Sequence, residues 1–257
     1  MNDVIIAGIG QTPVGEHWEV PLRSLAVQAI RLAILDSGGL KPSALFAANT
    51  LAPNLSGQAN LGTLLADYAG LHGLEATAFE LGGASGGAAL RQAALAVESG
   101  YIDVALVIGV EKFTDAVPPA HETAASTQTD SEYESVHGLT PAAQAALLAR
   151  RYQHEFNLPA DCLAGFPITA HANAAGNRFA YFRKPLSLQE YRQAEVHTDP
   201  LNTRDVAPYV DGAAALVLTR EELLPAGNTH PRVRLAASSS VSDSLALHDR
   251  PDILAFT

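Results

Sequence analysis

Apolar strand patterns alternate with amphipathic helical patterns over the first 113 residues, and this alternation limits the possible folds more than any other feature. Strands that alternate with helices need crossover connections, which favour a mainly parallel sheet covered on both faces. We therefore expect an α/β fold. The predicted strands are residues 4–9, 44–52, 76–81 and 103–113, and the predicted helices are residues 21–40, 58–70 and 86–100.

A long polar segment, residues 117–136, interrupts the alternation soon after Thr114. Long excursions in compact domains are usually functional or mobile. A clear helix is predicted beyond it, at residues 140–156. Thr140 stands at its N-cap and Pro141 at its first helical position, as both residue types prefer.

The strand pattern returns at residues 211–218, "DGAAALVL", which we expect to rejoin the sheet as its fifth strand. The residues between the fourth and fifth strands then form an insertion that lies over the sheet. The remaining predicted elements are helices at residues 159–177 and 184–195 and one more strand at residues 232–243.

The charge balance restricts the partners. A net charge of −11 over 257 residues argues against nucleic acid or an anionic membrane face as a partner, because both require basic surface.

The single cysteine, Cys162, excludes an intrachain disulfide and fits a reducing cytoplasm. We expect neither a signal peptide nor a membrane span. The nine histidines are scattered, none three or four residues from Cys162, so no metal site is predicted.

Two glycine runs follow predicted strands. Gly8-Ile9-Gly10 lacks the third glycine of a dinucleotide-binding fingerprint and is predicted as a tight turn. The second run lies in "FELGGASGGAALRQAALAV", residues 79–97, where glycines open a helix. Glycines at such a turn let a ligand approach the backbone and leave helix N–H groups free for an acceptor. The turn is typical of the floor of a site, yet it contains no Cys, His, Asp or Lys.

Six segments in the same order resemble the thiolases, nearest the sterol-carrier-protein type and its archaeal acetyl-CoA acetyltransferase relatives. They are "IIAGIGQTPVG", "LGGASGGAALRQAALAV", "VIGVEKFTD", "HGLTPAAQAALLARRY", "NRFAYFRKPLSLQEY" and "VAPYVDGAAALVLTREE". The resemblance covers almost the whole chain. It implies a thiolase-like α/β fold whose five-layer architecture has two similar halves, usually in a dimer.

The resemblance assigns the predicted parts of the chain. Residues 1–116 and 208–228 would form the N-terminal core around a mainly parallel five-stranded sheet, and residues 117–207 an inserted loop domain. Residues 229–257 would begin a second half that is largely missing. The family's remaining catalytic motifs lie in that half, and none is present here. A truncated chain, a proteolysed product and one subunit of a split enzyme all remain open.

Gly83 stands where the family has its nucleophilic cysteine. A thiolase needs that thiolate as nucleophile and acyl carrier, and glycine supplies neither function. Ser85 is the nearest alternative nucleophile, although the family's matching serine is structural and no base is adjacent. Cys162 is another candidate, but the family has no reactive thiol there.

The other candidate site residues also follow from the resemblance. His137 lies in a loop that would overhang the pocket, where it would line the pocket or act as an acid or base. Backbone N–H groups of the turn from Gly83 to Ser85 would hold a thioester carbonyl, and Gly83, Ala84 and Gly86 would contact the substrate. Three cations would contact the phosphates of coenzyme A or else form an ordinary solvated face. They are Arg178, Arg183 and Lys184.

The resemblance predicts a protein that acts on acyl-CoA thioesters. With Gly83 in place of cysteine, we expect carbon–carbon bond cleavage or formation without a thiol, as in retro-aldolases that work beside a small nucleotide-fold or zinc-ribbon partner. A name of acetyl-CoA acetyltransferase is expected, but not that activity. The alternative is a non-catalytic acyl-CoA-binding or scaffolding subunit. In either case we expect a coenzyme A thioester as ligand and no covalently bound cofactor. We also expect a homodimer, or a hetero-oligomer whose partner is either a subunit that supplies the missing half or a small protein.

Overall fold

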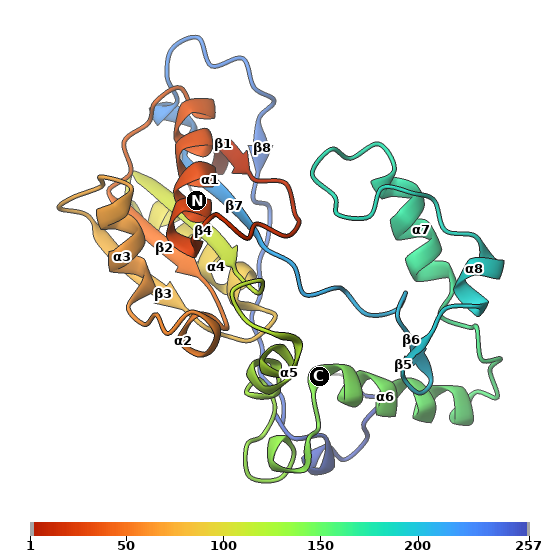
Figure 1. Ribbon diagram of the computed structural model, residues 1–257. Coiled ribbons are helices and arrows are strands. Elements are labelled where there is room, and N and C mark those ends of the chain that lie inside the picture. The colour runs from red at the N-terminus through yellow and green to blue at the C-terminus, as the bar shows by residue number, and fades with distance from the viewer. Residues whose placement is uncertain (1–2, 256–257) are drawn as a thin grey trace. The chain divides into compact units, whose positions relative to one another are not determined.

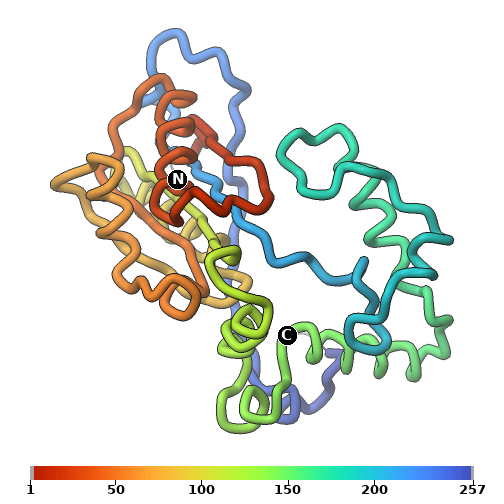
Figure 2. Tube along the Cα trace, in the orientation of Figure 1, coloured from red at the N-terminus to blue at the C-terminus, as the bar shows by residue number. Residues whose placement is uncertain are grey.

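The alternation of strands and helices is present in the computed structural model, which describes residues 3–255. These residues divide into two units, 3–116 with 210–240 and 117–209 with 241–255. The chain leaves the first unit after Ala116, returns at Val210 and leaves it again after Ser240 (Figure 2). The first unit contains β1 (Val4–Gln11), α1 (Leu22–Asp36), β2 (Ala44–Ala48), α2 (Ala52–Leu55), α3 (Leu61–Tyr68), β3 (Glu75–Phe79), α4 (Ser85–Glu98), β4 (Val104–Glu111), β7 (Gly212–Arg220), the 3₁₀ turn η2 (Glu221–Leu223) and β8 (Val233–Arg234).

The sheet of the first unit has the strand order β3-β2-β4-β7-β1-β8 (Figure 1). Strand β2 pairs in parallel with β3 and β4, whereas β7 is antiparallel to both β4 and β1, and β8 is antiparallel to β1. The strands β1 to β4 therefore run one way and β7 and β8 the other. The α/β class is confirmed, but the sheet is mixed and has six strands rather than five. The sheet is mixed because β7 follows a long insertion rather than a helical crossover. It has a sixth strand because β8 pairs with β1 at the edge of the sheet.

Helices cover both faces of this sheet (Figure 1). Helices α1 and α3 pack on one face, where Leu106 and Ile108 of β4 are fully buried. Helix α4 packs on the other face, where Ala105 and Val107 point. Successive residues of a strand point to opposite faces, so a strand with helices on both sides must be apolar throughout.

Gly8 and Gly10 are part of strand β1, so the predicted tight turn is wrong. A Cβ atom built at Gly10 would lie 2.1 Å from the carbonyl oxygen of Ala29, and one at Gly8 would lie 2.4 Å from that of Ala33. Both glycines therefore allow the backbone of β1 to approach the backbone of α1 closely.

The second unit is mainly helical. Thr140 caps α6 as predicted, because its hydroxyl oxygen accepts a hydrogen bond from Ala143 N at 3.2 Å. A helix, α5, also forms within the polar segment 117–136, where neither a helix nor a strand was predicted. It begins at Pro118 and Pro119, because the fixed φ of proline suits the first turn of a helix. The elements are α5 (Pro118–Ser126), η1 (Ser135–His137), α6 (Pro141–Glu155), α7 (Gly165–Ala174), α8 (Leu188–Arg192), β5 (Val196–Thr198), β6 (Leu201–Asn202) and η3 (Leu247–Asp249).

Across residues 3–255, no helix combines the length and the apolar character that a bilayer crossing requires.

Candidate functional site

The glycine turn between β3 and α4 is closed by the side chain of Ser85. The Ser85 hydroxyl donates to Gly82 O at 2.7 Å and accepts from Leu81 N at 2.8 Å. It also lies 3.1 Å from the Thr50 hydroxyl. Gly82 has a φ of +54°, which a glycine adopts without strain. The Ser85 hydroxyl is therefore held by two backbone groups and a second hydroxyl, which is an arrangement for closing a turn.

A pocket of ≈ 500 Å³ opens over this turn. Gly82, Gly83, Ser85 and Gly86 form one side of it. The other sides come from the ends of β2 and β4, the residues around the end of β1 and the start of β7. Ligands of α/β proteins commonly bind beyond the carboxyl ends of the strands. The remaining lining residues are Gln11, Val14, Ala48, Asn49, Thr50, Gly109, Val110, Glu111, Val210, Asp211, Gly212, Ala213 and Ala214.

Gly83 is exposed and has room for a side chain. A Cβ atom built there meets no other heavy atom within 4 Å, and its φ lies outside the left-handed region. Neither packing nor backbone conformation therefore requires glycine at this position. Ala84 and Gly86 are exposed beside it. The pocket thus lacks a reactive side chain at a place where the fold could carry one.

Glu111 is the acidic residue at the end of β4 in this pocket. Its half-buried carboxylate accepts hydrogen bonds from Asn49 Nδ2 at 2.8 Å, Thr50 N at 3.1 Å and Leu51 N at 3.3 Å. Burial raises the pKa of Glu111 above its usual value, and the three hydrogen bonds offset only part of this effect. The sequence signal for Glu111 was its position at the end of a buried strand.

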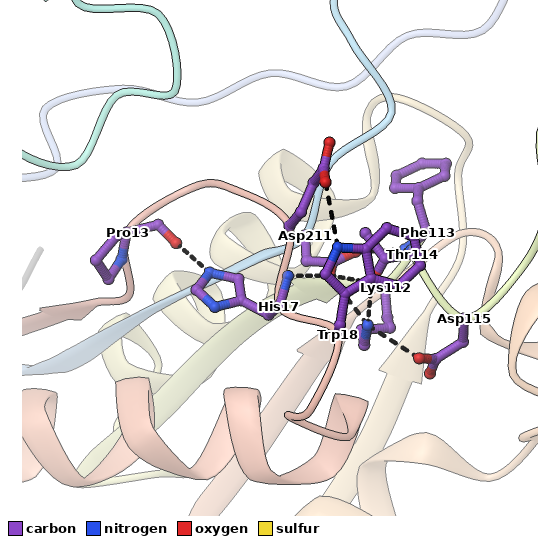
Figure 3. A network of polar contacts seen from close by, with 9 residues as sticks. Pro13, His17, Trp18, Lys112, Phe113, Thr114, Asp115 and Asp211 are labelled. Atoms are coloured by element: carbon purple, nitrogen blue, oxygen red, sulfur yellow. Dashed lines mark hydrogen bonds and ion pairs between the residues drawn. The ribbon is translucent and has the colours of Figure 1, made fainter.

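A buried ion pair lies at the same end of the sheet (Figure 3). Lys112 Nζ is 3.0 Å from Asp211 Oδ2, and both side chains are fully buried. Asp211 also accepts from Phe113 N at 2.7 Å, from Thr114 N at 3.0 Å, from Thr114 Oγ1 at 2.6 Å and from His17 N at 3.0 Å. Burial alone would raise the pKa of Asp211, but the hydrogen bonds from Thr114, His17 and Lys112 lower it to about 2.

This network joins the two ends of the insertion within the first unit. Lys112 also donates to Thr114 Oγ1 and pairs with Asp115 at 3.0 Å, just before the chain leaves the unit. Asp211 lies just after the chain returns, and five donors occupy its oxygens. We therefore assign Asp211 to the structure of the pocket wall rather than to proton transfer.

His137 lies in the second unit, whereas the glycine turn belongs to the first. It is the last residue of η1 and is exposed, and Gly138 follows it with a φ of +78°. Cys162, also in the second unit, is half-buried, and its sulfur accepts from Gln153 Nε2 at 3.7 Å.

The three predicted coenzyme A contacts lie together on the segment between α7 and α8. Arg178, Arg183 and Lys184 are exposed there, and the Arg178 guanidinium lies 4.7 Å from the centre of the Phe179 ring. The carbonyl of Lys184 is hydrogen-bonded to His171 Nδ1 at 3.0 Å. His171 also stacks on Phe182, with ring centres 5.5 Å apart. This segment presents exposed cations beside aromatic rings.

Within residues 3–255, no three His, Cys, Asp or Glu side chains are grouped so that they could hold a metal ion.

One family profile and several known proteins are similar to this chain. The family profile described as "Thiolase, N-terminal domain" matches residues 4–222. The acetyl-CoA acetyltransferase of Methanothermobacter thermautotrophicus is 36% identical over 98% of this chain and 66% of its own length. That of Methanocaldococcus jannaschii is 38% identical over 98% of this chain and 65% of its own length. The chain thus spans just under two thirds of the length of these relatives.

A relative that is named for a different reaction is also similar to this chain. The 17-hydroxy-3-oxo-4-pregnene-20-carboxyl-CoA lyase of Mycobacterium tuberculosis is 30% identical over 83% of this chain and 56% of its own length. Among solved structures, an Ltp2-ChsH2(DUF35) aldolase superposes with a TM-score of 0.79 at 24% identity, over 98% of this chain and 65% of that one. At that identity the superposition establishes a shared fold.

Proposed function

This chain belongs to the thiolase family, and we propose that it acts on acyl-CoA thioesters by breaking or forming a carbon–carbon bond without a cysteine nucleophile. The observation that carries the proposal is Gly83. The turn has space for a side chain there, yet the position holds none. Covalent acyl transfer needs a nucleophile at this point in the pocket. The Ser85 hydroxyl does not replace it, because turn closure occupies it.

A retro-aldol reaction needs no acyl-enzyme. A base removes the proton of a hydroxyl on the β-carbon of the acyl group, and that oxygen becomes a carbonyl. The bond between the α- and β-carbons breaks, its electron pair moves to the α-carbon, and the α-carbon takes up a proton. The products are an aldehyde or ketone and a shortened acyl-CoA. The name of the M. tuberculosis relative, a lyase of a CoA ester, supports this reaction class.

The role of the glycine turn is to stabilise negative charge on the thioester oxygen while the bond breaks. Backbone N–H groups directed at such an oxygen commonly supply a large part of catalysis. The N–H groups of Ala84 and Ser85 already donate to Leu81 O and Gly82 O. We therefore assign the contact with the thioester oxygen to Gly83 and to Gly86 in the first turn of α4.

The second unit contributes coenzyme A binding and a candidate acid or base. Arg178, Arg183 and Lys184 suit phosphate groups, because guanidinium and ammonium groups form charge-assisted hydrogen bonds with them. His137 is the candidate acid or base on this chain. The name of the solved Ltp2-ChsH2(DUF35) aldolase, which refers to two proteins, supports a partner subunit. We accordingly propose a homodimer or a complex with a partner subunit.

The decisive experiment compares two reactions of the protein purified from its source with whatever co-purifies. Incubation with a 3-hydroxyacyl-CoA is expected to give a carbonyl product and a shortened acyl-CoA, detected by liquid chromatography and mass spectrometry. Incubation with acetyl-CoA is expected to leave the intact mass of the chain unchanged. An acetylated chain would overturn the proposal.

A non-catalytic acyl-CoA-binding subunit is the second candidate. It is favoured by one observation: both acidic side chains of the pocket, Glu111 and Asp211, are engaged in hydrogen bonds that hold the backbone. Retention of acetyl-CoA binding without turnover of any 3-hydroxyacyl-CoA, in the complete assembly, would select this candidate.

A further inference from the structure

We propose that Glu111 is a positioning residue for the glycine turn, which it holds through Thr50, and that the two residues together set how tightly the pocket binds a thioester carbonyl. This inference rests on the proposed function, because it concerns the same pocket. It adds two residues of one hydrogen-bonded relay to that site, neither of which touches the reacting atoms.

The first link of the relay runs from Glu111 to the loop after β2. Strands β2 and β4 are parallel neighbours with Ala48 opposite Gly109, so the loop that follows Ala48 lies beside Glu111. The Glu111 carboxylate accepts from the Thr50 and Leu51 backbone N–H groups at 3.1 and 3.3 Å. A carboxylate that accepts several N–H groups holds a loop more strongly than neutral acceptors do.

Asn49 makes this loop more rigid. Its side-chain amide donates to Glu111 Oε1 at 2.8 Å and to Val110 O at 2.7 Å. Its oxygen accepts from Ala52 N at 2.7 Å, at the start of α2. The backbone of Thr50 is thus tied on both sides, and its side chain is directed at the turn.

The second link runs from the Thr50 side chain to the turn itself. Thr50 Oγ1 donates to Gly82 O at 2.8 Å and lies 3.1 Å from Ser85 Oγ. Ser85 Oγ in turn accepts from Leu81 N. The contacts from Glu111 through Thr50 to Gly82 and Ser85 are therefore continuous.

The relay matters because the turn has little other support on its pocket side. Cβ atoms built at Gly83, Gly86 and Gly87 each meet open space, so no packed side chain fixes this part of the backbone from above. Hydrogen bonds to a developing oxyanion depend strongly on the placement of their donors. The side chains of Thr50 and Ser85 therefore add to the turn's own hydrogen bonds, which are Ala84 N to Leu81 O, Ser85 N to Gly82 O and Gly82 N to Glu80 Oε1, in holding these donors in place.

The experiment measures the affinity for acetyl-CoA relative to the affinity for free coenzyme A, which has no carbonyl. We would measure both by isothermal titration for the wild type, T50V, T50S, E111Q and T50V/E111Q. T50V removes the hydroxyl at nearly constant shape, and T50S keeps it. T63V, on the exposed face of α3, is a matched control for the substitution itself.

The ratio of the two affinities is expected to fall about five- to tenfold in T50V and in E111Q, the size of one or two lost hydrogen bonds. T50S should restore it, and T63V should leave it unchanged. The double variant should lose no more than either single variant, because residues of one relay are not independent. Additive losses, or an unchanged ratio in T50V, would overturn the proposal.

Two further results keep this test separate from the proposed function. If E111Q does not fold, the comparison of T50V with T50S decides alone. If the wild type binds neither acetyl-CoA nor coenzyme A, the proposed function fails, and the relay is tested by amide hydrogen exchange of Leu81. Faster exchange in T50V than in T50S supports the relay, and equal exchange refutes it.

Discussion

The Lys112 ammonium lies 3.0 Å from the Asp211 carboxylate in a completely buried ion pair, although the two residues are 99 positions apart. Lys112 follows β4 and Asp211 precedes β7, the two strands that adjoin at the centre of the sheet. The pair therefore connects the end of one central strand with the beginning of the next. Removal of one member would leave the other charge buried without its partner, which is much more costly than losing a surface pair.

The variant D211N is expected to lower the free energy of unfolding by about 3–5 kcal/mol, the usual cost of breaking a buried pair from one side. Urea unfolding of D211N measures this loss. E155Q provides the control, because Glu155 forms a half-exposed pair with Arg151 and its loss should cost at most about 1 kcal/mol. Equal losses in the two variants would contradict a special role for Asp211.

We also expect the contribution of Asp211 to the free energy of unfolding to depend on pH in the acid range. The pKa of Asp211 in the folded protein, about 2, lies below its usual value of 3.8. Asp211 therefore contributes stability that is present above pH 3.8 and is lost as the pH falls toward 2. Unfolding free energies measured through this range should fall more steeply for the wild type than for D211N. Parallel profiles would show that Asp211 does not titrate with the expected shift.

For Glu111 we expect the contribution to stability to change with pH in the opposite direction. Its folded pKa is raised above 4.5, so its contribution to stability is present below pH 4.5 and is lost as the pH rises through the folded pKa. The stability of the wild type relative to E111Q should therefore decrease from pH 4.5 toward neutral pH. Denaturant unfolding at several pH values in this range tests the sign, and an increase would show that the hydrogen bonds to Glu111 outweigh its burial.

Cysteine should fit at Gly83. The open space around a Cβ atom there predicts that G83C leaves the free energy of unfolding unchanged or raises it by about 0.5 kcal/mol, since the unfolded chain loses freedom. The new thiol should react with an exposed-thiol reagent faster than the half-buried Cys162. C162S supplies the background in which this reaction is measured, and a large loss of stability would show that the turn requires glycine.

Glycines at two other positions should respond in opposite ways to alanine. G10A should destabilise the fold by about 3 kcal/mol or more, because its Cβ would lie 2.1 Å from the Ala29 carbonyl oxygen in a tightly packed layer. G87A, in the first turn of α4 with open space around the added atom, should stabilise by about 0.5 kcal/mol. Thermal unfolding of both variants measures the contrast, and equal midpoints would contradict the packing of β1 on α1.

Local patterns predicted most elements of the first unit, because each strand or helix there is specified by its own periodicity. The cap of α6 was readable from Thr140 and Pro141 alone. The polar composition after Pro119 concealed α5, because its buried residues include the polar His121 and Ser126. The direction of β7 was equally hidden, because hydrophobic runs do not record which neighbour a strand will pair with.

Part of the candidate site could likewise be predicted from the sequence, and part could not. The glycine turn and the absence of a nucleophile at Gly83 are visible in the residues themselves. The contact between Thr50 and Gly82 is not, because it joins two loops whose proximity follows from sheet order. Nor does the composition around Lys112 indicate that its partner is Asp211.

The strand order also has a consequence for biosynthesis. Strand β1 leaves the ribosome before the other strands of its sheet, yet its sheet neighbours are β7 and β8. Its pairing with β7 joins residues roughly 200 positions apart. Strands β2, β3 and β4 can pair soon after they are translated, whereas the apolar β1 has no neighbouring strand to pair with until β7 emerges. During that interval the nascent chain exposes an unpaired strand, the condition in which chaperones are most needed and aggregation is most probable. Strand β1 is thus made before β2, β3 and β4 and yet enters the sheet after them.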